Sequence, residues 1–271
     1  MLSTKEITRK WETIAQGKAS LSIPNLLLLG ILAGMFIAFG ALGSTVVSSG
    51  VGGGLGKLLG ACVFPTGLIL VVMAGAELFT GNCLMAGPAL NGKVKWTGVL
   101  RNWCFVYLGN MLGSGIMVRL IMASGFLWNK DLTASFMSIA MAKCTLPFDA
   151  ALLRGIGCNI LVCGAVWMAS GADHAAGKAL CCFFPVMLFV LCGFEHSVAN
   201  MFYVPLGVLL GKYMGSSFIW HRFDVSYPLP EGYLTQVTIS AYLLKNLLPV
   251  TIGNIIGGAG LSMIYARVHR D

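Results

Sequence analysis

Charged side chains are scarce in this sequence. Only 10% of the 271 residues are charged, against 57% that are hydrophobic, and the mean hydropathy is +0.82. Such a chain has too little polar surface to cover a water-soluble globule. No ionisable side chain occurs between Lys18 and Lys57, an interval longer than the roughly 20 apolar residues that cross a hydrocarbon layer about 30 Å thick. The composition therefore predicts an integral protein of a lipid bilayer.

Acidic residues are few, and paired cysteine motifs are missing. The sequence has 10 Asp and Glu against 18 Lys and Arg, a formal net charge of +8. The basic residues stand singly near the ends of apolar segments, which argues against a nucleic-acid partner and is typical of positions near lipid headgroups. The nine cysteines contain no C-x-x-C pair, so we expect no metal site, no disulfide scaffold and no cofactor.

The N-terminal 20 residues are too polar for a signal peptide, and the apolar run that follows is too long for one. Ser3 and Glu6 have the spacing of a helix capping box, and hydrophobic residues recur after them at helical intervals. We predict an amphipathic N-terminal helix over residues 1–20, lying at the membrane surface, and a six-span membrane channel domain over residues 21–271. The basic residues of this helix favour the cytoplasmic side.

Six apolar segments are long enough to cross the bilayer. Six spans put both termini on one side, and the distribution of Lys and Arg favours the cytoplasmic side of a cell membrane. We predict the spans at about residues 25–48, 56–90, 98–126, 150–170, 180–210 and 237–265.

The second and fifth spans are too long for simple helices and contain polar residues at mid-depth. Gly75, Gly81 and Gly87 in the second span and Gly193 in the fifth allow the backbone to leave the helical path. The freed backbone groups have no partners in lipid, so they must lie within protein or beside water. We therefore predict that both helices are broken.

The sequence repeats itself. Residues 75–82 and 193–200 share the pattern G-x-E-x-x-x-x-N, 118 positions apart. In residues 101–113 and 245–257, a basic residue and Asn are followed by Gly-Asn and Gly, 144 positions apart. The second offset is larger than the first because the loop over residues 212–234 is longer than its counterpart over residues 91–97.

A weaker match joins Gly30-Ile31 to Gly155-Ile156, so the chain consists of three spans repeated. An odd number of spans in each copy inverts the second copy and brings the two broken helices face to face at the midplane. The predicted fold is all-α, with six transmembrane helices in a 3+3 inverted repeat.

Ionisable residues inside the spans are candidates for function, because a charge at the bilayer centre costs at least about 2.5–3.5 kcal/mol. Glu77 and Glu195 occupy equivalent repeat positions, and we interpret them as structural acceptors of hydrogen bonds from freed amides or neighbouring spans. His196 aligns with Leu78 and breaks this symmetry. Because imidazole changes charge near neutral pH, we interpret His196 as a proton donor or cation facing a passage; a hydrogen-bonded structural histidine is the alternative.

Other polar residues near the breaks could bind an anion. The Thr80 and Ser197 hydroxyls could replace part of its hydration shell, and Lys143 could concentrate anions at the entrance. Interhelical hydrogen bonds, and a headgroup-facing lysine, are the alternatives. The amides that could donate to an anion are Asn82, Asn159 and Asn200.

Large apolar side chains beside the breaks could narrow a passage, although lipid-facing packing is their ordinary role. The candidates for such a constriction are Phe64, Leu78, Phe79, Phe189 and Phe194.

At these residues the sequence resembles the formate/nitrite transporter family. Residues 74–80 (Ala-Gly-Ala-Glu-Leu-Phe-Thr) are similar to one family signature. Residues 193–202 (Gly-Phe-Glu-His-Ser-Val-Ala-Asn-Met-Phe) are similar to the second, which is long and specific. The likeness extends over residues 155–168 and 245–257, and so over essentially the whole membrane domain.

This resemblance implies an aquaporin-like protomer and a homopentamer with one pathway through each protomer. The transported substrate that the resemblance implies is a small monovalent anion such as formate, nitrite or hydrosulfide, with or without a proton. It places Thr80 on the loop of the broken second span, Lys143 in the outer vestibule, and His196 at the centre. Asn159 and Asn200 would lie near the histidine, Phe64 and Phe189 at the outer constriction, and Leu78 at the inner one.

Two other functional classes fit part of this sequence pattern. A neutral-solute or ammonium channel would also suit an inverted repeat with a central histidine, and Lys143 is the feature that favours anions. An enzyme that used His196 and Cys192 would lack a further base, a metal set or a cofactor motif, so we expect no enzymatic activity. The sequence does not distinguish among the anions.

Overall fold

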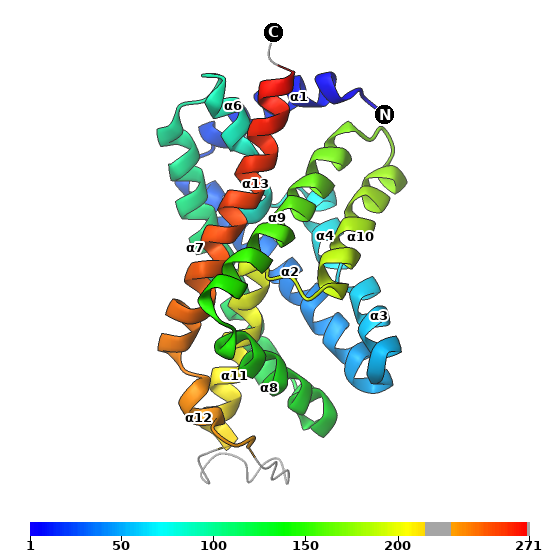
Figure 1. Ribbon diagram of the computed structural model, residues 1–271, viewed down its shortest axis with the longest axis vertical. Helices are drawn as coiled ribbons and strands as arrows, with labels where there is room; N and C mark the ends of the chain where they lie inside the picture. Colours follow the sequence, from blue (N-terminus) through cyan, green and yellow to red (C-terminus); the bar gives the residue numbers. More distant parts are fainter. Residues whose placement is uncertain (215–228, 270–271) are drawn as a thin grey trace.

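The computed structural model describes residues 1–214 and 229–269, and within them all regular secondary structure is helical (Figure 1). The first half of the chain contains α1 (Thr4–Ser20), α2 (Ile23–Val51), α3 (Gly53–Val63), α4 (Thr66–Ala74), α5 (Phe79–Asn82), the 3-10 turn η1 (Cys83–Met85), α6 (Ala86–Leu90) and α7 (Trp96–Ala123). The second half contains the 3-10 turn η2 (Phe126–Trp128), α8 (Lys130–Thr145), α9 (Phe148–Gly171), α10 (Ala175–Leu191), α11 (Ser197–Met214), α12 (Tyr233–Gln236), the π-helix η4 (Ala241–Leu247) and α13 (Leu248–Val268). Most of the predicted loop over residues 212–234 lies outside the described residues.

The helices occupy the six predicted spans. Within the described residues, the segments long and apolar enough to cross a membrane are Ile23–Val51, Gly53–Ala74, Trp96–Ala123, Phe148–Gly171 and Ala241–Val268, and α10 is a shorter apolar helix. The predicted second span is divided among α3 to α6, and the predicted fifth span between α10 and α11. The prediction of an all-α membrane fold with broken second and fifth spans is confirmed.

Two glycines end the first halves, in chain order, of the broken helices. Gly75 follows α4 with φ +73°, and Gly193 follows α10 with φ +68°. This left-handed conformation costs an L-residue about 1–2 kcal/mol, and glycine avoids that cost. Gly81 and Gly87 were also predicted to permit a break, but they lie within α5 and α6 and do not have positive φ. Gly87 instead lets its helix pack closely on Ser262.

Glycines also allow the long helices to pack in pairs, α2 with α7 and α9 with α13. A Cβ atom at Gly113 would overlap the carbonyl oxygen of Ile31, and one at Gly257 would overlap that of Ile156. These two close approaches involve equivalent positions of the two repeats. The internal repeat predicted from the sequence is therefore also a repeat of packing.

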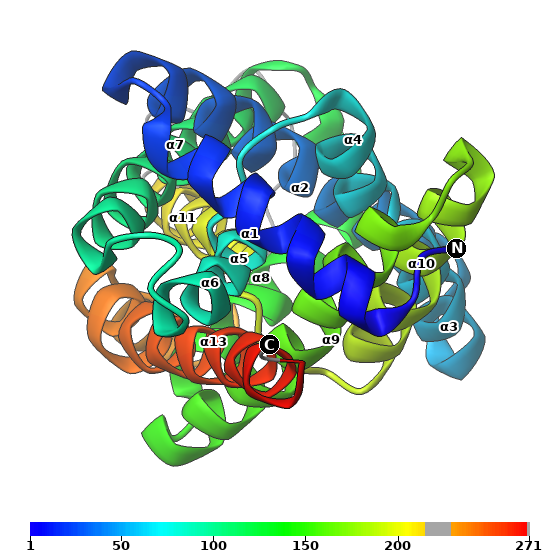
Figure 2. The same cartoon turned by 90° about the horizontal axis from the view of Figure 1, so that it is seen from above.

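An amphipathic helix precedes the first span of each half. α1 lies across one end of the bundle (Figure 2), at the end where α13 finishes (Figure 1). Its capping box is formed, because Ser3 N–H donates to Glu6 Oε2 at 2.7 Å and Glu6 N–H donates to Ser3 Oγ at 3.4 Å. The counterpart, α8, was not predicted from the sequence and lies at the opposite end of the bundle, against α11.

Candidate functional site

The two helix breaks meet inside the bundle. The chain crosses from α4 to α5 over residues 75–78 and from α10 to α11 over residues 192–196. There the Oγ1 atom of Thr80 lies 2.8 Å from Nε2 of His196. Thr80 is 0% exposed and His196 is 3% exposed. The contact joins the two halves of the chain across positions that are not equivalent in the repeat.

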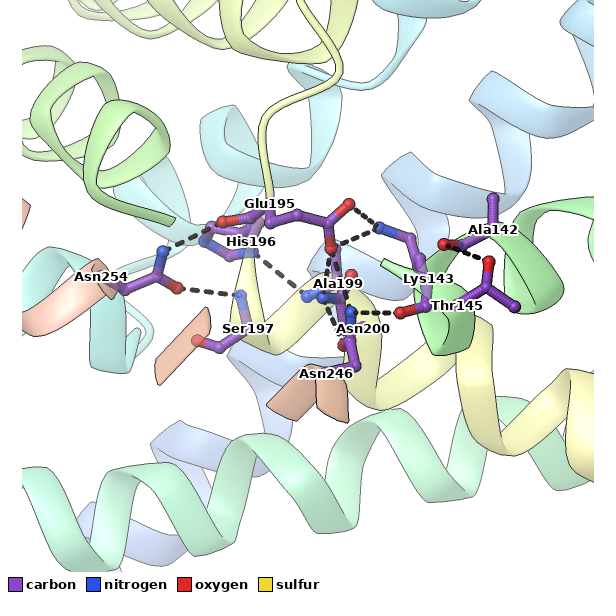
Figure 3. A network of polar contacts seen from close by, with 10 residues as sticks. All are labelled: Ala142, Lys143, Thr145, Glu195, His196, Ser197, Ala199, Asn200, Asn246 and Asn254. Carbon is purple, nitrogen blue, oxygen red and sulfur yellow. Dashed lines mark hydrogen bonds and ion pairs between the residues drawn. The ribbon is translucent and has the colours of Figure 1, made fainter. Parts of the chain in front are cut away.

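The hydrogen bonds of His196 define which ring nitrogen carries the proton. The backbone N–H of Ala199 donates to Nδ1 at 3.1 Å (Figure 3), so Nδ1 is the acceptor and the histidine caps the start of α11. In a neutral imidazole the other nitrogen is then the donor. Nε2–H therefore donates to Thr80. A second proton, on Nδ1, would point at an N–H group and at the positive end of a helix dipole.

Glu195 lies directly before the histidine and is held by three side chains (Figure 3). Its carboxylate accepts hydrogen bonds from Lys143 Nζ, which lies 3.0 Å from both oxygens, and from Asn200 Nδ2 at 2.7 Å. Asn246 Nδ2 lies 3.4 Å from the same carboxylate, and Asn246 Oδ1 accepts from Asn200 at 2.7 Å. The Glu195 side chain is 8% exposed, so it is a buried charge with its partners supplied by neighbouring helices.

Glu77 has the same surroundings at the first break. It accepts from Lys18 Nζ at 2.6 Å and from Asn82 Nδ2 at 2.7 Å, and Asn82 also donates to Asn102 Oδ1 at 2.8 Å. Lys18 precedes Lys143 by 125 positions, the separation of the Gly30 and Gly155 motifs. The repeat therefore contains one buried Lys–Glu ion pair at each break.

Two asparagines satisfy the backbone groups that the breaks leave free. Asn254 Oδ1 accepts from the N–H of Ser197 at 2.9 Å, and its Nδ2 donates to the carbonyls of Glu195 at 3.0 Å and Gly155 at 2.8 Å. Asn110, its repeat equivalent, makes the corresponding three bonds at the first break, at 2.8–2.9 Å. Both asparagines belong to the sequence repeat, but the predicted site did not include them.

Asn159 and Asn200, both predicted near the histidine, are buried in these networks. Asn159 Nδ2 donates to the carbonyl oxygens of Thr80 at 3.1 Å and Asn254 at 2.6 Å. Among the described residues, the side-chain oxygens of Asn159 and Asn200 find no hydrogen-bond partner. Asn159 therefore ties α9 to the loop that carries Thr80.

Two cavities approach the Thr80–His196 contact from opposite ends of the bundle. The Lys143 cavity has a volume of about 360 Å³ and lies beside α3 and α8. The Lys18 cavity has a volume of about 330 Å³ and lies beneath α1. The Lys143 cavity is lined by Ser44, Thr45, Ser48, Gly53, Lys57, Ala61, Phe64, Ile139, Lys143, Phe189, Val190, Gly193, Phe194, Glu195, His196, Ala199 and Tyr203. The Lys18 cavity is lined by Lys10, Trp11, Ile14, Lys18, Leu68, Val71, Val72, Gly75, Ala76, Glu77, Leu78, Gly81, Asn82, Val166, Ala169, Ser170 and Lys178.

Buried apolar side chains line both cavities, and the two cavities share no lining residue among the described parts of the chain. On the Lys143 side, the Phe64 and Phe189 rings meet edge to face at 5.6 Å, and Phe189 stacks on His196 at 5.9 Å. On the Lys18 side, Leu68 and Leu78 are both buried. Large apolar side chains therefore lie in the wall of each cavity, with His196 in the wall of the Lys143 cavity as well.

The structure places the predicted constriction residues in two groups. Phe64, Phe189 and Phe194 line the Lys143 cavity, and Leu78 lines the Lys18 cavity. Phe79 lines neither of the two cavities: its ring packs edge to face on Trp103 at 6.2 Å and on Tyr107 at 4.8 Å.

Lys143 lines its cavity, and its charge is paired with Glu195 rather than free. Lys18, the corresponding lysine, was assigned only to the basic N-terminal segment. A search at the 125-residue offset of Gly30 and Gly155 would have found both Lys18 and α8. In the described parts of the chain, no group of three or more His, Cys, Asp or Glu residues is placed to hold a metal ion.

Known proteins match this chain over nearly its whole length. The family model of the formate/nitrite transporters matches residues 5–267. The probable formate transporter of Methanothermobacter thermautotrophicus is 36% identical, over 95% of this chain and 93% of its own. The formate channel FocA of Haemophilus influenzae is also 36% identical, over 98% of this chain and 94% of its own.

Two solved structures share the fold. A pentameric formate channel with formate bound superposes with a TM-score of 0.76 at 35% identity, over 91% of this chain and 96% of that one. An ion channel of the FNT family superposes with a TM-score of 0.82 at 26% identity, over 97% of this chain and 98% of that one.

Proposed function

Because the chain belongs to the formate/nitrite transporter family, we propose that it is a membrane channel that passes formate through each protomer. The family consists of transport proteins rather than enzymes. The observation that carries the proposal is the buried hydrogen bond between His196 and Thr80, which lies between two cavities at opposite ends of the bundle. Both partners of this bond are groups that can bind a small anion.

The route runs from one cavity to the other through the Thr80–His196 contact. The paired rings of Phe64 and Phe189 on one side, and Leu68 and Leu78 on the other, exclude a hydrated ion. An anion between them loses its water shell and needs a replacement donor. The Nε2–H of His196 and the hydroxyl of Thr80 supply it.

In this proposal His196 donates a hydrogen bond rather than a proton. The Nδ1 atom accepts from the Ala199 N–H, so the imidazole is neutral and carries its proton on Nε2. Giving up that proton would leave an imidazolate, which is inaccessible near neutral pH. A proton that crosses with the anion would first have to occupy Nδ1, at the loss of the helix cap. This proposal differs from the interpretation of His196 as a proton donor or cation.

A central hydrogen-bond donor favours anions of weak acids over chloride. Formate, nitrite and hydrosulfide are the conjugate bases of weak acids and accept stronger hydrogen bonds than chloride does. The difference is largest where water is excluded and the local dielectric is low. We therefore propose selectivity for this class of anion, with formate as the reference substrate because the relatives are formate channels.

The assembly we propose is a homopentamer in the cell membrane with both termini in the cytoplasm. A relative that superposes over 91% of this chain is a pentamer. The basic residues of α1 favour the cytoplasmic side, which puts the Lys18 cavity inside and the Lys143 cavity outside. Native mass spectrometry of the detergent-solubilised protein tests the oligomer, and accessibility of α1 to a membrane-impermeant reagent tests the orientation.

Uptake into proteoliposomes tests the proposed function. The wild type should pass labelled formate and should exclude glycerol and methylammonium, the probes of the alternative neutral-solute or ammonium channel. His196→Phe removes the donor and should abolish formate flux. His196→Gln keeps an N–H near the Nε2 position without a titrating group and should keep a measurable part of the flux.

The control is Ser124→Ala. Ser124 follows α7, lines neither cavity, and its hydroxyl donates to the carbonyl oxygen of Ile121, so its loss should leave formate flux unchanged. Wild-type flux in His196→Phe would refute a role for the histidine. Equal loss in His196→Gln and His196→Phe would show that His196 has to transfer a proton and not only donate a hydrogen bond.

A further inference from the structure

Each cavity contains at least one lysine besides the one in its ion pair. Lys57 on α3 lines the Lys143 cavity, and Lys178 on α10 lines the Lys18 cavity. Lys57 is exposed and Lys178 is half-buried. Among the described residues, neither side chain forms a hydrogen bond or an ion pair, whereas the charges of Lys143 and Lys18 are compensated by Glu195 and Glu77.

The charge that each cavity presents to an approaching ion therefore comes from lysines outside the ion pairs. Glu195 is the only acidic residue that lines the Lys143 cavity in the described part of the chain, and it is neutralised by Lys143. This leaves Lys57 in excess. In the Lys18 cavity, Glu77 is neutralised by Lys18, and the excess consists of Lys178 and Lys10. Lys10 already donates to the carbonyl of Ser170 at 2.7 Å.

Lys57 and Lys178 also hold similar places on their helices. Each lies near the start of the helix that leads from one end of the bundle toward the middle: Lys57 in α3, which begins at Gly53, and Lys178 in α10, which begins at Ala175. Lys57 precedes Phe64 by seven residues, about 10 Å along a helix axis at 1.5 Å per residue. A charge at that distance can attract an anion without holding it at the constriction.

We propose that Lys57 and Lys178 are the anion-collecting residues of the two cavities, while Lys143 and Lys18 hold the glutamates of the helix breaks. The inference rests on the proposed anion transport and identifies which charges promote it. A unit charge about 10 Å from the constriction, in a partly aqueous cavity, raises the local concentration of a monovalent anion about two- to fourfold at low ionic strength. Salt screens this effect, because the Debye length falls from about 30 Å at 0.01 M to about 3 Å at 1 M.

The experiment measures formate permeability of the full-length protein in phosphatidylcholine liposomes, at formate concentrations well below saturation. Ionic strength is varied from about 0.01 M to about 1 M with gluconate as the added anion. Lys57→Gln should lower the permeability about two- to fourfold in low salt. Lys178→Gln should also lower it in low salt, and both differences from wild type should vanish in high salt. Lys57→Arg keeps the charge and should behave as the wild type.

Matched controls are lysines at the same ends of the bundle that line neither cavity. Lys130, at the start of α8, serves for Lys57, and Lys95, before α7, serves for Lys178; both are exposed. Their replacement by Gln should leave the permeability unchanged. The inference is overturned if Lys57→Gln and Lys178→Gln match the wild type in low salt, or if their loss persists in high salt and in Lys57→Arg. A wild type that passes no formate would instead refute the proposed function itself.

Discussion

The ammonium group of Lys143 lies 3.0 Å from both carboxylate oxygens of Glu195, and the two side chains are only 13% and 8% exposed. Removing one partner of such a pair leaves a buried charge without compensation. Lys143→Met should therefore lower the free energy of unfolding by about 3 kcal/mol, measured by thermal unfolding in detergent. The double variant Lys143→Met/Glu195→Gln should recover much of this loss, and Lys130→Met is the exposed control. If the double variant is no more stable than the single one, the pair does not act as a unit.

Thr80 is the acceptor of the His196 Nε2–H bond. Thr80→Val keeps the shape of the side chain but removes the hydroxyl, so the buried N–H loses its partner. An unsatisfied buried N–H costs about 1–3 kcal/mol, and about 1.4 kcal/mol corresponds to a factor of ten, so formate permeability should fall at least tenfold. Thr80→Ser keeps the hydroxyl, and its permeability should stay within about threefold of wild type. Formate flux into proteoliposomes, measured for the wild type and both variants, tests this expectation. Equal permeability in the Val and Ser variants would show that the hydroxyl is not used.

Gly193 ends α10 in the left-handed conformation, and a Cβ atom there would meet nothing within 4 Å. Gly193→Ala should therefore destabilise the protein through backbone strain alone, by about 1–2 kcal/mol. Gly115 on α7 also has open space around it but lacks a positive φ, so Gly115→Ala should be neutral or stabilising. The two unfolding temperatures in the same detergent test this contrast. Similar shifts would contradict the assignment of a strained break.

Asn254 and Asn110 satisfy the free backbone groups at the two breaks. Asn254→Leu would leave the Ser197 N–H and the Glu195 carbonyl without their partner, and an unsatisfied buried polar group costs about 1–3 kcal/mol. Asn110→Leu should cause a loss of similar size, since its contacts are equivalent. Thermal unfolding of both variants in detergent measures the loss of stability. A large loss in only one of them would show that the repeats are not energetically alike.

Glu6 closes the capping box of α1, which lies outside the spans. Its hydrogen bonds with Ser3 hold the pKa of the carboxyl below its ordinary value, so their contribution to helix stability is present above the ordinary pKa and is lost as the pH falls through the folded-state pKa. Amide hydrogen exchange at the start of α1 should accelerate, after correction for intrinsic rates, as the pH falls below the usual range of glutamate. In Glu6→Gln this pH dependence should be absent. An unchanged profile in that variant would assign the effect to another group.

The membrane fold could be predicted because composition, span length and repeats are properties of the chain itself. Spans of about 20 apolar residues, breaks at Gly75 and Gly193, and the shared G-x-E-x-x-x-x-N pattern all follow from local sequence and the cost of polar groups in lipid. α8 was not predicted, because it is not apolar enough to resemble a span. Gly81 and Gly87 do not break a helix, and Gly87 serves close packing against Ser262 instead.

The sequence by itself therefore determined the class of protein, the inverted repeat and the residues that had to lie at mid-depth. Only the tertiary structure decided how those residues pair: Lys143 with Glu195, Lys18 with Glu77, Asn254 with a free amide, and His196 with both Ala199 and Thr80. Except for the Ala199 contact, these partners are separated by at least 52 residues. No sequence periodicity relates these partners. A hydrogen bond requires that donor and acceptor be placed to within a few tenths of an ångström and in the right direction, and that placement arises only when the helices pack.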